Sequence, residues 1–216
     1  VVESQHRVHA AVIGEDEVLV GAARDVGLVS LWRSCAKFFQ VMPLVASGGF
    51  DQLGWGDREL ALACASHGGE PEHVALAGSM LESMGLEEGD LACGPHEPLS
   101  VRGAKLWRDS GAPLSRLHNN CSGKHAAMLG RAKTAGWAIR GYEQSDHPVQ
   151  RACVGEVSSW SGVPLDDMPL AVDGCGVTVM GLPLDRMALA YARLARAIHA
   201  GDEIPARIAA AVLRHP

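Results

Sequence analysis

Residues 118–125 read His-Asn-Asn-Cys-Ser-Gly-Lys-His, and an apolar run, Ala-Ala-Met-Leu, follows them without a break. Polar groups crowded directly before an apolar run are typical of a loop that delivers reactive side chains to the start of a helix. Cys121 and Lys124 are three residues apart, so on a helix they share a face. A thiol near a helix N-terminus with an ammonium beside it ionises readily. The segment therefore predicts a reactive site at a helix start.

The composition narrows the class of protein and of partner. With 216 residues, 47% of them hydrophobic and 20% charged, the chain can bury the core of a globular domain. The net charge of −6 and the lack of a basic cluster argue against nucleic acid or an anionic membrane as a partner. No window approaches the roughly 18 apolar residues of a membrane span, and the polar start does not resemble a signal peptide. Six cysteines without a Cys-x-x-Cys pair predict a reducing, cytoplasmic location.

Hydrophobic periodicity and turn residues predict both strands and helices. Residues 8–13 and 18–22 read as strands joined by a hairpin, and residues 169–172 as a short strand. Helices are predicted over residues 31–42, 58–65, 71–84, 122–135, 148–161, 184–200 and 206–213, with residues 86–115 irregular. This is the pattern of one α+β, or mixed α/β, domain over residues 1–216. Because the last helical run stops without a cap or tail, we expect a chain shortened at its C-terminus.

The Ser-x-x-Lys motif of Ser34 and Lys37 predicts a nucleophile and its base. On a helix the two residues share a face, so Nζ of the lysine can reach Oγ of the serine. Trp32, Phe38 and Phe39 flank the lysine, and partial burial lowers the pKa of a lysine until its neutral amine can take a hydroxyl proton. The motif is also common by chance, and the alternative is an exposed lysine on an amphipathic helix.

Ser66 and His67 lie where a predicted helix ends in a glycine pair, which places the serine well to meet a ligand. His67, Glu70 and His73 have a spacing seen in metal sites. The glycines and the proline between them would break the helix that a His-Glu-x-x-His site needs. Helix capping is therefore the favoured interpretation of this segment.

Cys121, Lys124 and Cys175 together suggest a metal. Two thiolates could bind Zn²⁺ with a third ligand and water, although lysine is a rare ligand and the cysteines are too far apart for a zinc finger. The alternative is one free thiol at a helix start and one on the tight turn Asp-Gly-Cys-Gly at residues 173–176. In that case Asp173 simply serves the turn.

Four segments, in this order and spacing, resemble the asparaginase II family of the rhizobial type. They are Arg-Ser-Cys-Ala-Lys at residues 33–37, Leu-Ala-Leu-Ala-Cys-Ala-Ser-His at 60–67, Asn-Asn-Cys-Ser-Gly-Lys-His at 119–125 and Val-Asp-Gly-Cys-Gly at 172–176. The resemblance covers essentially the whole chain. It implies hydrolysis of L-asparagine to L-aspartate and ammonia by a homodimer, on a fold similar to serine β-lactamases and penicillin-binding proteins.

The resemblance also implies roles for individual residues. Ser34 would be the nucleophile or its close partner, with Lys37 as base and Ser66 as a second serine. Zn²⁺ would be held near the substrate by Cys121, Lys124 and Cys175. Supporting positions around substrate and metal would fall to His67, Asp173 and His125. Family members are longer, so this chain would correspond to about their N-terminal two-thirds, and the lysine partner of the second serine would lie beyond residue 216.

Two other functions fit the same residues. A β-lactamase-like or peptidase acyl-enzyme would use the same serine chemistry, but the sequence has neither an export signal nor a Lys-Thr-Gly motif. A truncated, non-catalytic globular protein would bind zinc without turning over substrate.

Overall fold

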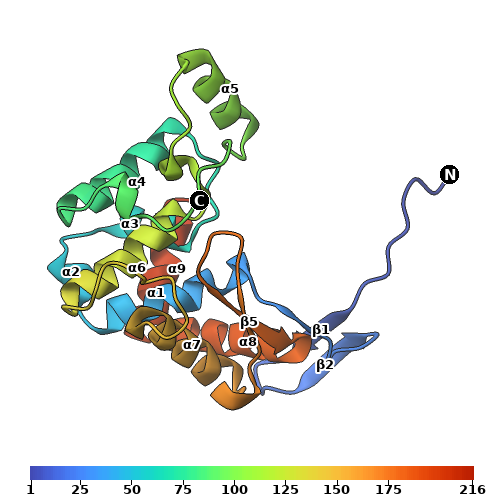
Figure 1. Ribbon diagram of the computed structural model, residues 1–216. Coiled ribbons are helices and arrows are strands. Elements are labelled where there is room, and N and C mark those ends of the chain that lie inside the picture. Colours follow the sequence, from blue (N-terminus) through green and yellow to red (C-terminus); the bar gives the residue numbers. More distant parts are fainter.

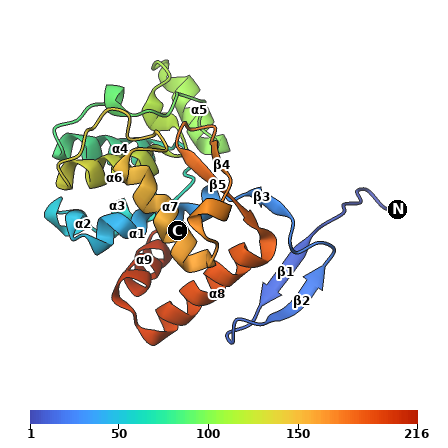
Figure 2. The ribbon, with the colours of Figure 1, turned by 60° about the horizontal axis from the view of Figure 1, so that its bottom comes forward.

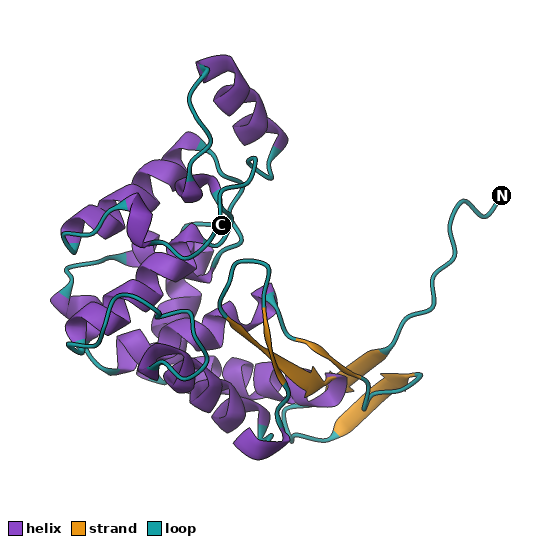
Figure 3. Ribbon diagram, viewed as in Figure 1, coloured by secondary structure: helices purple, strands orange, loops and turns teal.

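The computed structural model describes residues 1–216 as a helical body with small sheets at one side (Figure 1; Figure 3). The helices are α1 (Lys37–Ala46), α2 (Gly49–Gln52), α3 (Asp57–Cys64), α4 (Pro71–Ser83), α5 (Val101–Ser110), α6 (Ser122–Thr134), α7 (Pro148–Ser161), α8 (Leu184–Ala200) and α9 (Glu203–Arg214). The strands are β1 (Ala10–Ile13), β2 (Leu19–Ala23), β3 (Val29–Leu31), β4 (Leu170–Val172) and β5 (Thr178–Pro183). This confirms the mixed α+β class, while the likeness to serine β-lactamases stays a prediction.

The strands form two antiparallel sheets. β1 and β2 make the predicted hairpin, with Ala10 opposite Ala23. The second sheet has the order β3-β5-β4, and its central strand is buried while both outer strands are exposed. Because β5 pairs with both neighbours, it brings the segment after β3 beside the turn between β4 and β5. These two segments carry Ser34 and Cys175.

The hairpin is fixed to the helical body through α8 (Figure 2). Glu17, at the hairpin turn, accepts hydrogen bonds from Arg193 at 2.7 Å and from Arg196 at 2.6 Å. Both arginines lie on α8, one turn apart, so one carboxylate is held by two guanidinium groups. None of the helices combines the length and the apolar character that crossing a membrane requires.

Helix α6 is the centre of the body. Every residue from 122 to 130 is buried, and α1, α3, α4 and α7 pack around it. Gly123 allows the close approach of α3, since a Cβ there would lie 2.6 Å from the carbonyl oxygen of Leu62. The polar start of this helix is therefore inside the protein, and its charged groups must find partners there.

Several predicted helices are confirmed, but three regions differ from the prediction. Residues 86–115 are not irregular throughout, because α5 forms within them. Oγ of Ser100 caps that helix by accepting a hydrogen bond from the N–H of Gly103 at 2.8 Å, and Gly111 ends it with a φ of 65°. These two capping residues could have predicted the helix from the sequence. Strand β5 was also missed, because its run is apolar without alternation, which is how a strand buried on both faces reads.

The helix predicted over residues 31–42 was wrong at both ends. Leu31 belongs to β3, and Ser34–Ala36 form a 3₁₀ turn before α1 begins at Lys37. At the other end, α1 continues through Pro43 to Ala46. A proline inside a helix removes one hydrogen bond to the carbonyl four residues earlier. Burial of the apolar residues around Pro43 offsets that loss.

The six cysteines are free thiols, and all except Cys35 are buried. This agrees with the interpretation of most of these cysteines as small buried hydrophobic residues.

Candidate active site

Lys37 joins three segments of the chain. It is the first residue of α1 and is only 1% exposed. Its Nζ donates hydrogen bonds to the carbonyl oxygen of Ala65 at 2.5 Å, to Oγ of Ser66 at 2.9 Å and to the carbonyl oxygen of Asn120 at 3.4 Å. Burial lowers the pKa of Lys37, because removal from water disfavours the ammonium. An amine of this kind can take a proton from a hydroxyl group.

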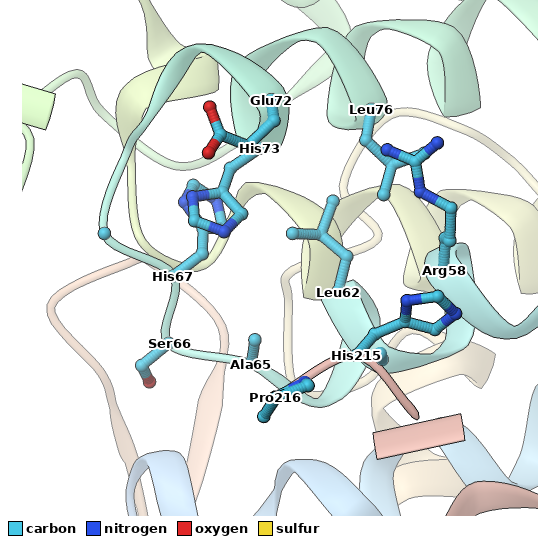
Figure 4. Close-up of a pocket in the computed structure, with 12 residues that line it drawn as sticks. Arg58, Leu62, Ala65, Ser66, His67, Glu72, His73, Leu76, His215 and Pro216 are labelled. Atoms are coloured by element: carbon cyan, nitrogen blue, oxygen red, sulfur yellow. The ribbon is translucent and has the colours of Figure 1, made fainter. Parts of the chain in front are cut away.

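Ser66 lies on the extended segment that follows α3 and is exposed to solvent. With its neighbours Ala65 and His67 it borders a cavity of about 490 Å³, whose other walls include Arg58 and His73 (Figure 4). A cavity of this size is in the usual range for small-molecule sites. The serine that Lys37 contacts therefore borders a space for a substrate, with its hydroxyl turned away from the other labelled side chains in Figure 4.

Ser34 does not form the expected pair with Lys37. The prediction placed both residues on one face of a continuous helix. Instead, Ser34 opens the 3₁₀ turn and is exposed, whereas the side chain of Lys37 extends to the loop after α3. The amine of Lys37 is bonded instead to Ser66 and to the carbonyl oxygens of Ala65 and Asn120. The catalytic role of Ser34 stays a prediction.

His67 holds the segment that carries Ser66. It is 4% exposed, and its Nδ1 accepts a hydrogen bond from the N–H of Gly69 at 3.1 Å. Nε2 must then carry the proton, which it donates to Oγ of Ser122 at 2.8 Å. Burial, with His73 as a further cause, lowers the pKa of His67 to about 3. The ring is therefore neutral, and it is better suited to positioning the loop than to proton transfer.

Cys121, Lys124 and Cys175, the predicted metal ligands, lie in one cluster. Cys121 precedes α6, Lys124 lies in its first turn, and Cys175 lies on the turn between β4 and β5. Nζ of Lys124 is 3.0 Å from Sγ of Cys175. A hydrogen bond from Cys175 and the nearby Lys124 lower the pKa of Cys121 to about 5. The same hydrogen bond, together with burial, raises the pKa of Cys175 to about 11.

The charge of Lys124 belongs to the same cluster. Burial opposes the ammonium, yet the Cys121 and Cys175 thiols raise the pKa of Lys124 above its usual range. The buried ammonium thus shares the cluster with the Cys121 thiolate, an arrangement in which a buried charge is tolerated.

Asp173 connects the cysteine cluster to the segment that carries Ser34. Its Oδ2 lies 3.5 Å from Sγ of Cys175, and Nε of Arg33 donates to its Oδ1 at 2.6 Å. Although burial opposes the charge, Arg33 holds the pKa of Asp173 below its usual range. Asp173 is therefore more than a turn residue, because it orders the cluster and the chain next to Ser34.

His125 also lies in this region, fully buried on α6, with Nδ1 2.5 Å from Oη of Tyr142. Arg33, Asn120 and Tyr142 were not among the predicted site residues. Arg33 and Asn120 flank residues that were. Tyr142, in a short linker, offered no signal.

The residues of the cluster suit a zinc ion. No group of three or more His, Cys, Asp or Glu side chains is placed to hold a metal ion. Beside the two sulfurs, the nearest further donor of the predicted set is Nζ of Lys124, 3.0 Å from Sγ of Cys175. Thiolates are preferred zinc ligands, and the low pKa of Cys121 keeps one thiolate present at neutral pH. Lys124 would have to lose its proton when the metal binds.

No protein of curated function matches the chain. The family model described as L-asparaginase II matches residues 1–216. Since that match covers every residue described above, the chain belongs to the L-asparaginase II family.

Proposed function

We propose that this protein hydrolyses L-asparagine to L-aspartate and ammonia, with Lys37 activating Ser66. Membership of the L-asparaginase II family supports an amidohydrolase. The observation that carries the proposal is the 2.9 Å hydrogen bond between Nζ of the buried lysine and Oγ of the serine at the cavity. A lysine of lowered pKa is a suitable general base at neutral pH.

The proposed reaction has two halves. Neutral Lys37 takes the proton of Ser66, and Oγ attacks the side-chain amide carbon of L-asparagine. As the tetrahedral intermediate collapses, Lys37 returns the proton to the departing ammonia and leaves an aspartyl ester on Ser66. Water then loses a proton to Lys37 and attacks the ester. As the ester bond breaks, Lys37 returns that proton to Oγ of Ser66, and L-aspartate is released.

Zinc is the second part of the proposal. Cys121, Cys175 and the deprotonated amine of Lys124 would hold the ion. Zn²⁺ there would supply a positive charge that orients the substrate or stabilises the loops that carry Cys121 and Cys175. His67, Asp173 and His125 would support these positions. A cytoplasmic homodimer is also proposed, and sedimentation equilibrium tests the dimer.

Ammonia release from L-asparagine tests the hydrolase directly. We expect release by the unaltered chain, loss of at least a hundredfold in Ser66→Ala, and a smaller loss in Ser34→Ala. The reverse order would make Ser34 the nucleophile. A folded chain that binds zinc but releases no ammonia would instead be the non-catalytic zinc-binding protein. Opening of a chromogenic β-lactam without asparagine turnover would indicate a β-lactamase-like enzyme.

A further inference from the structure

The loop of residues 94–97 is bonded to the segment that precedes α6. The ring of His96 makes the first contact, because its Nε2 accepts a hydrogen bond from the backbone N–H of Asn120 at 2.9 Å. The buried side chain of Asn119 makes the second, because its Nδ2 donates to the carbonyl oxygen of Gly94 at 2.6 Å. The loop therefore supports a stretch of backbone that reaches the candidate active site.

The partners of His96 define where its ring carries a proton. Nδ1 lies 2.7 Å from the carbonyl oxygen of Glu97, which can only accept, so Nδ1 is protonated. Nε2 is then unprotonated and accepts the N–H of Asn120. Oδ1 of Asn120 lies 3.2 Å from the same nitrogen, but it is an acceptor only for a ring that is protonated at Nε2. The neutral ring therefore holds the backbone of Asn120.

The peptide group between Asn120 and Cys121 is held from both sides. A trans peptide places its N–H and its C=O on opposite sides of one plane. The N–H, which belongs to Cys121, donates to Oδ1 of Asn119 at 2.9 Å. The carbonyl oxygen, which belongs to Asn120, accepts from the N–H of His67 at 3.2 Å and from Nζ of Lys37 at 3.4 Å. The direction of this carbonyl is therefore fixed relative to the amine.

The neutral amine of Lys37 has two hydrogens, one lone pair and three partners. The carbonyl oxygens of Ala65 and Asn120 can only accept, so each takes one N–H. The lone pair is then left for Oγ of Ser66, the one partner that has a proton to donate. If either carbonyl turned away, the amine would no longer be confined to the orientation in which it can take that proton.

We propose that the carbonyl oxygen of Asn120 directs the lone pair of neutral Lys37 toward Ser66, and that His96 is the positioning residue that fixes this carbonyl. The inference rests on the proposed serine chemistry and adds to it a residue that does not border the cavity. Loss of the His96 contact should therefore affect proton transfer and leave substrate binding unchanged. Misplacement by about 1 Å can cost a reaction up to about a hundredfold in rate.

The first test is the rate of ammonia release from L-asparagine. His96→Asn keeps a polar group near Nδ1 and removes the acceptor at Nε2, so we expect kcat to fall about tenfold at an unchanged KM. His96→Gln should restore most of the rate, because its Oε1 is an acceptor near the position of Nε2. A fall in kcat of the same size in both variants, or none in His96→Asn, would overturn the proposal.

His147→Asn is the matched control. His147 also bonds two backbone groups, since its Nδ1 accepts from the N–H of Val149 at 3.2 Å and its Nε2 lies 3.0 Å from the carbonyl oxygen of Ala138. The asparagine can still cap α7 and loses only the Nε2 contact. We expect this variant to keep the kcat of the unaltered chain. A tenfold loss there too would show that any such contact matters equally, against a specific role for His96.

The second test needs no asparagine. Oγ of a serine activated by a base displaces fluoride from a fluorophosphonate, and mass spectrometry locates the label. We expect the label on Ser66, about tenfold slower in His96→Asn and at the unaltered rate in His96→Gln. Such labelling without ammonia release would reject asparagine as the substrate and support the positioning role. Equal labelling rates in all three proteins, or no label on Ser66, would overturn the proposal.

Discussion

Lys37 and Ser66 are separated by 29 residues in the sequence, and the structure places Nζ of the lysine 2.9 Å from Oγ of the serine. The lysine is buried and the serine is exposed. The hydrogen bond therefore links a base inside the protein to a serine that borders a cavity.

Replacing Lys37 with methionine should abolish most turnover. Methionine keeps much of the length of the side chain and removes the base, so we expect ammonia release to fall at least a hundredfold. Lys133→Met changes an exposed lysine of α6 and is the matched control. Activity within tenfold of the unaltered chain in a folded Lys37→Met protein would exclude Lys37 as the base.

Because His67 is held neutral, the free energy of unfolding should decrease as the pH falls into the mildly acidic range. Its pKa is about 3 in the folded protein and about 6.5 when unfolded. The unfolded state therefore binds the extra proton first, and stability present above pH 6.5 is lost as the pH falls toward 3. Between pH 7 and pH 5 one such histidine contributes a loss of about 2 kcal/mol in the free energy of unfolding.

Urea unfolding of His67→Gln at both pH values checks this expectation. The variant should show a smaller decrease between pH 7 and pH 5 than the unaltered chain. His199→Gln, at an exposed position on α8, should keep the full decrease. An unchanged pH dependence in His67→Gln would show that the ring is not held neutral.

Asp173→Asn should weaken zinc binding roughly tenfold, because the amide keeps the shape of the carboxylate and loses the charge beside Cys175. Asp109→Asn, which alters an exposed carboxylate paired with Lys105, is the control. Chelator competition gives both affinities. Equal affinities would limit Asp173 to shaping the turn between β4 and β5.

Gly123→Ala should destabilise the protein by about 1–3 kcal/mol, because the added Cβ meets the backbone of Leu62 where α3 crosses α6. Gly155 lies inside α7, and a Cβ there meets nothing within 4 Å. Gly155→Ala should therefore be neutral or stabilising by up to about 1 kcal/mol. Urea unfolding compares the two. Equal effects would mean that the approach of α3 to α6 is not tight.

Local signals predicted much of the secondary structure. Pro148 and Gly162 bound α7, and Pro71 begins α4, because proline and glycine restrict the backbone regardless of the rest of the chain. The secondary structure around Ser34 was harder to predict. Its helical spacing was plausible in isolation, but pairing of β3 with β5, which are distant in the sequence, displaced the start of the helix to Lys37.

The sequence by itself determined which reactive groups are available: the residues of the cysteine cluster, the Ser-x-x-Lys motif, and the family to which their order points. Only the tertiary structure decided the partners. It paired Lys37 with Ser66, Asp173 with Arg33 and His125 with Tyr142. Periodicity and capping act over a few residues and are readable along the chain. Each of these contacts instead depends on where packing around α6 and pairing along β5 bring distant loops together.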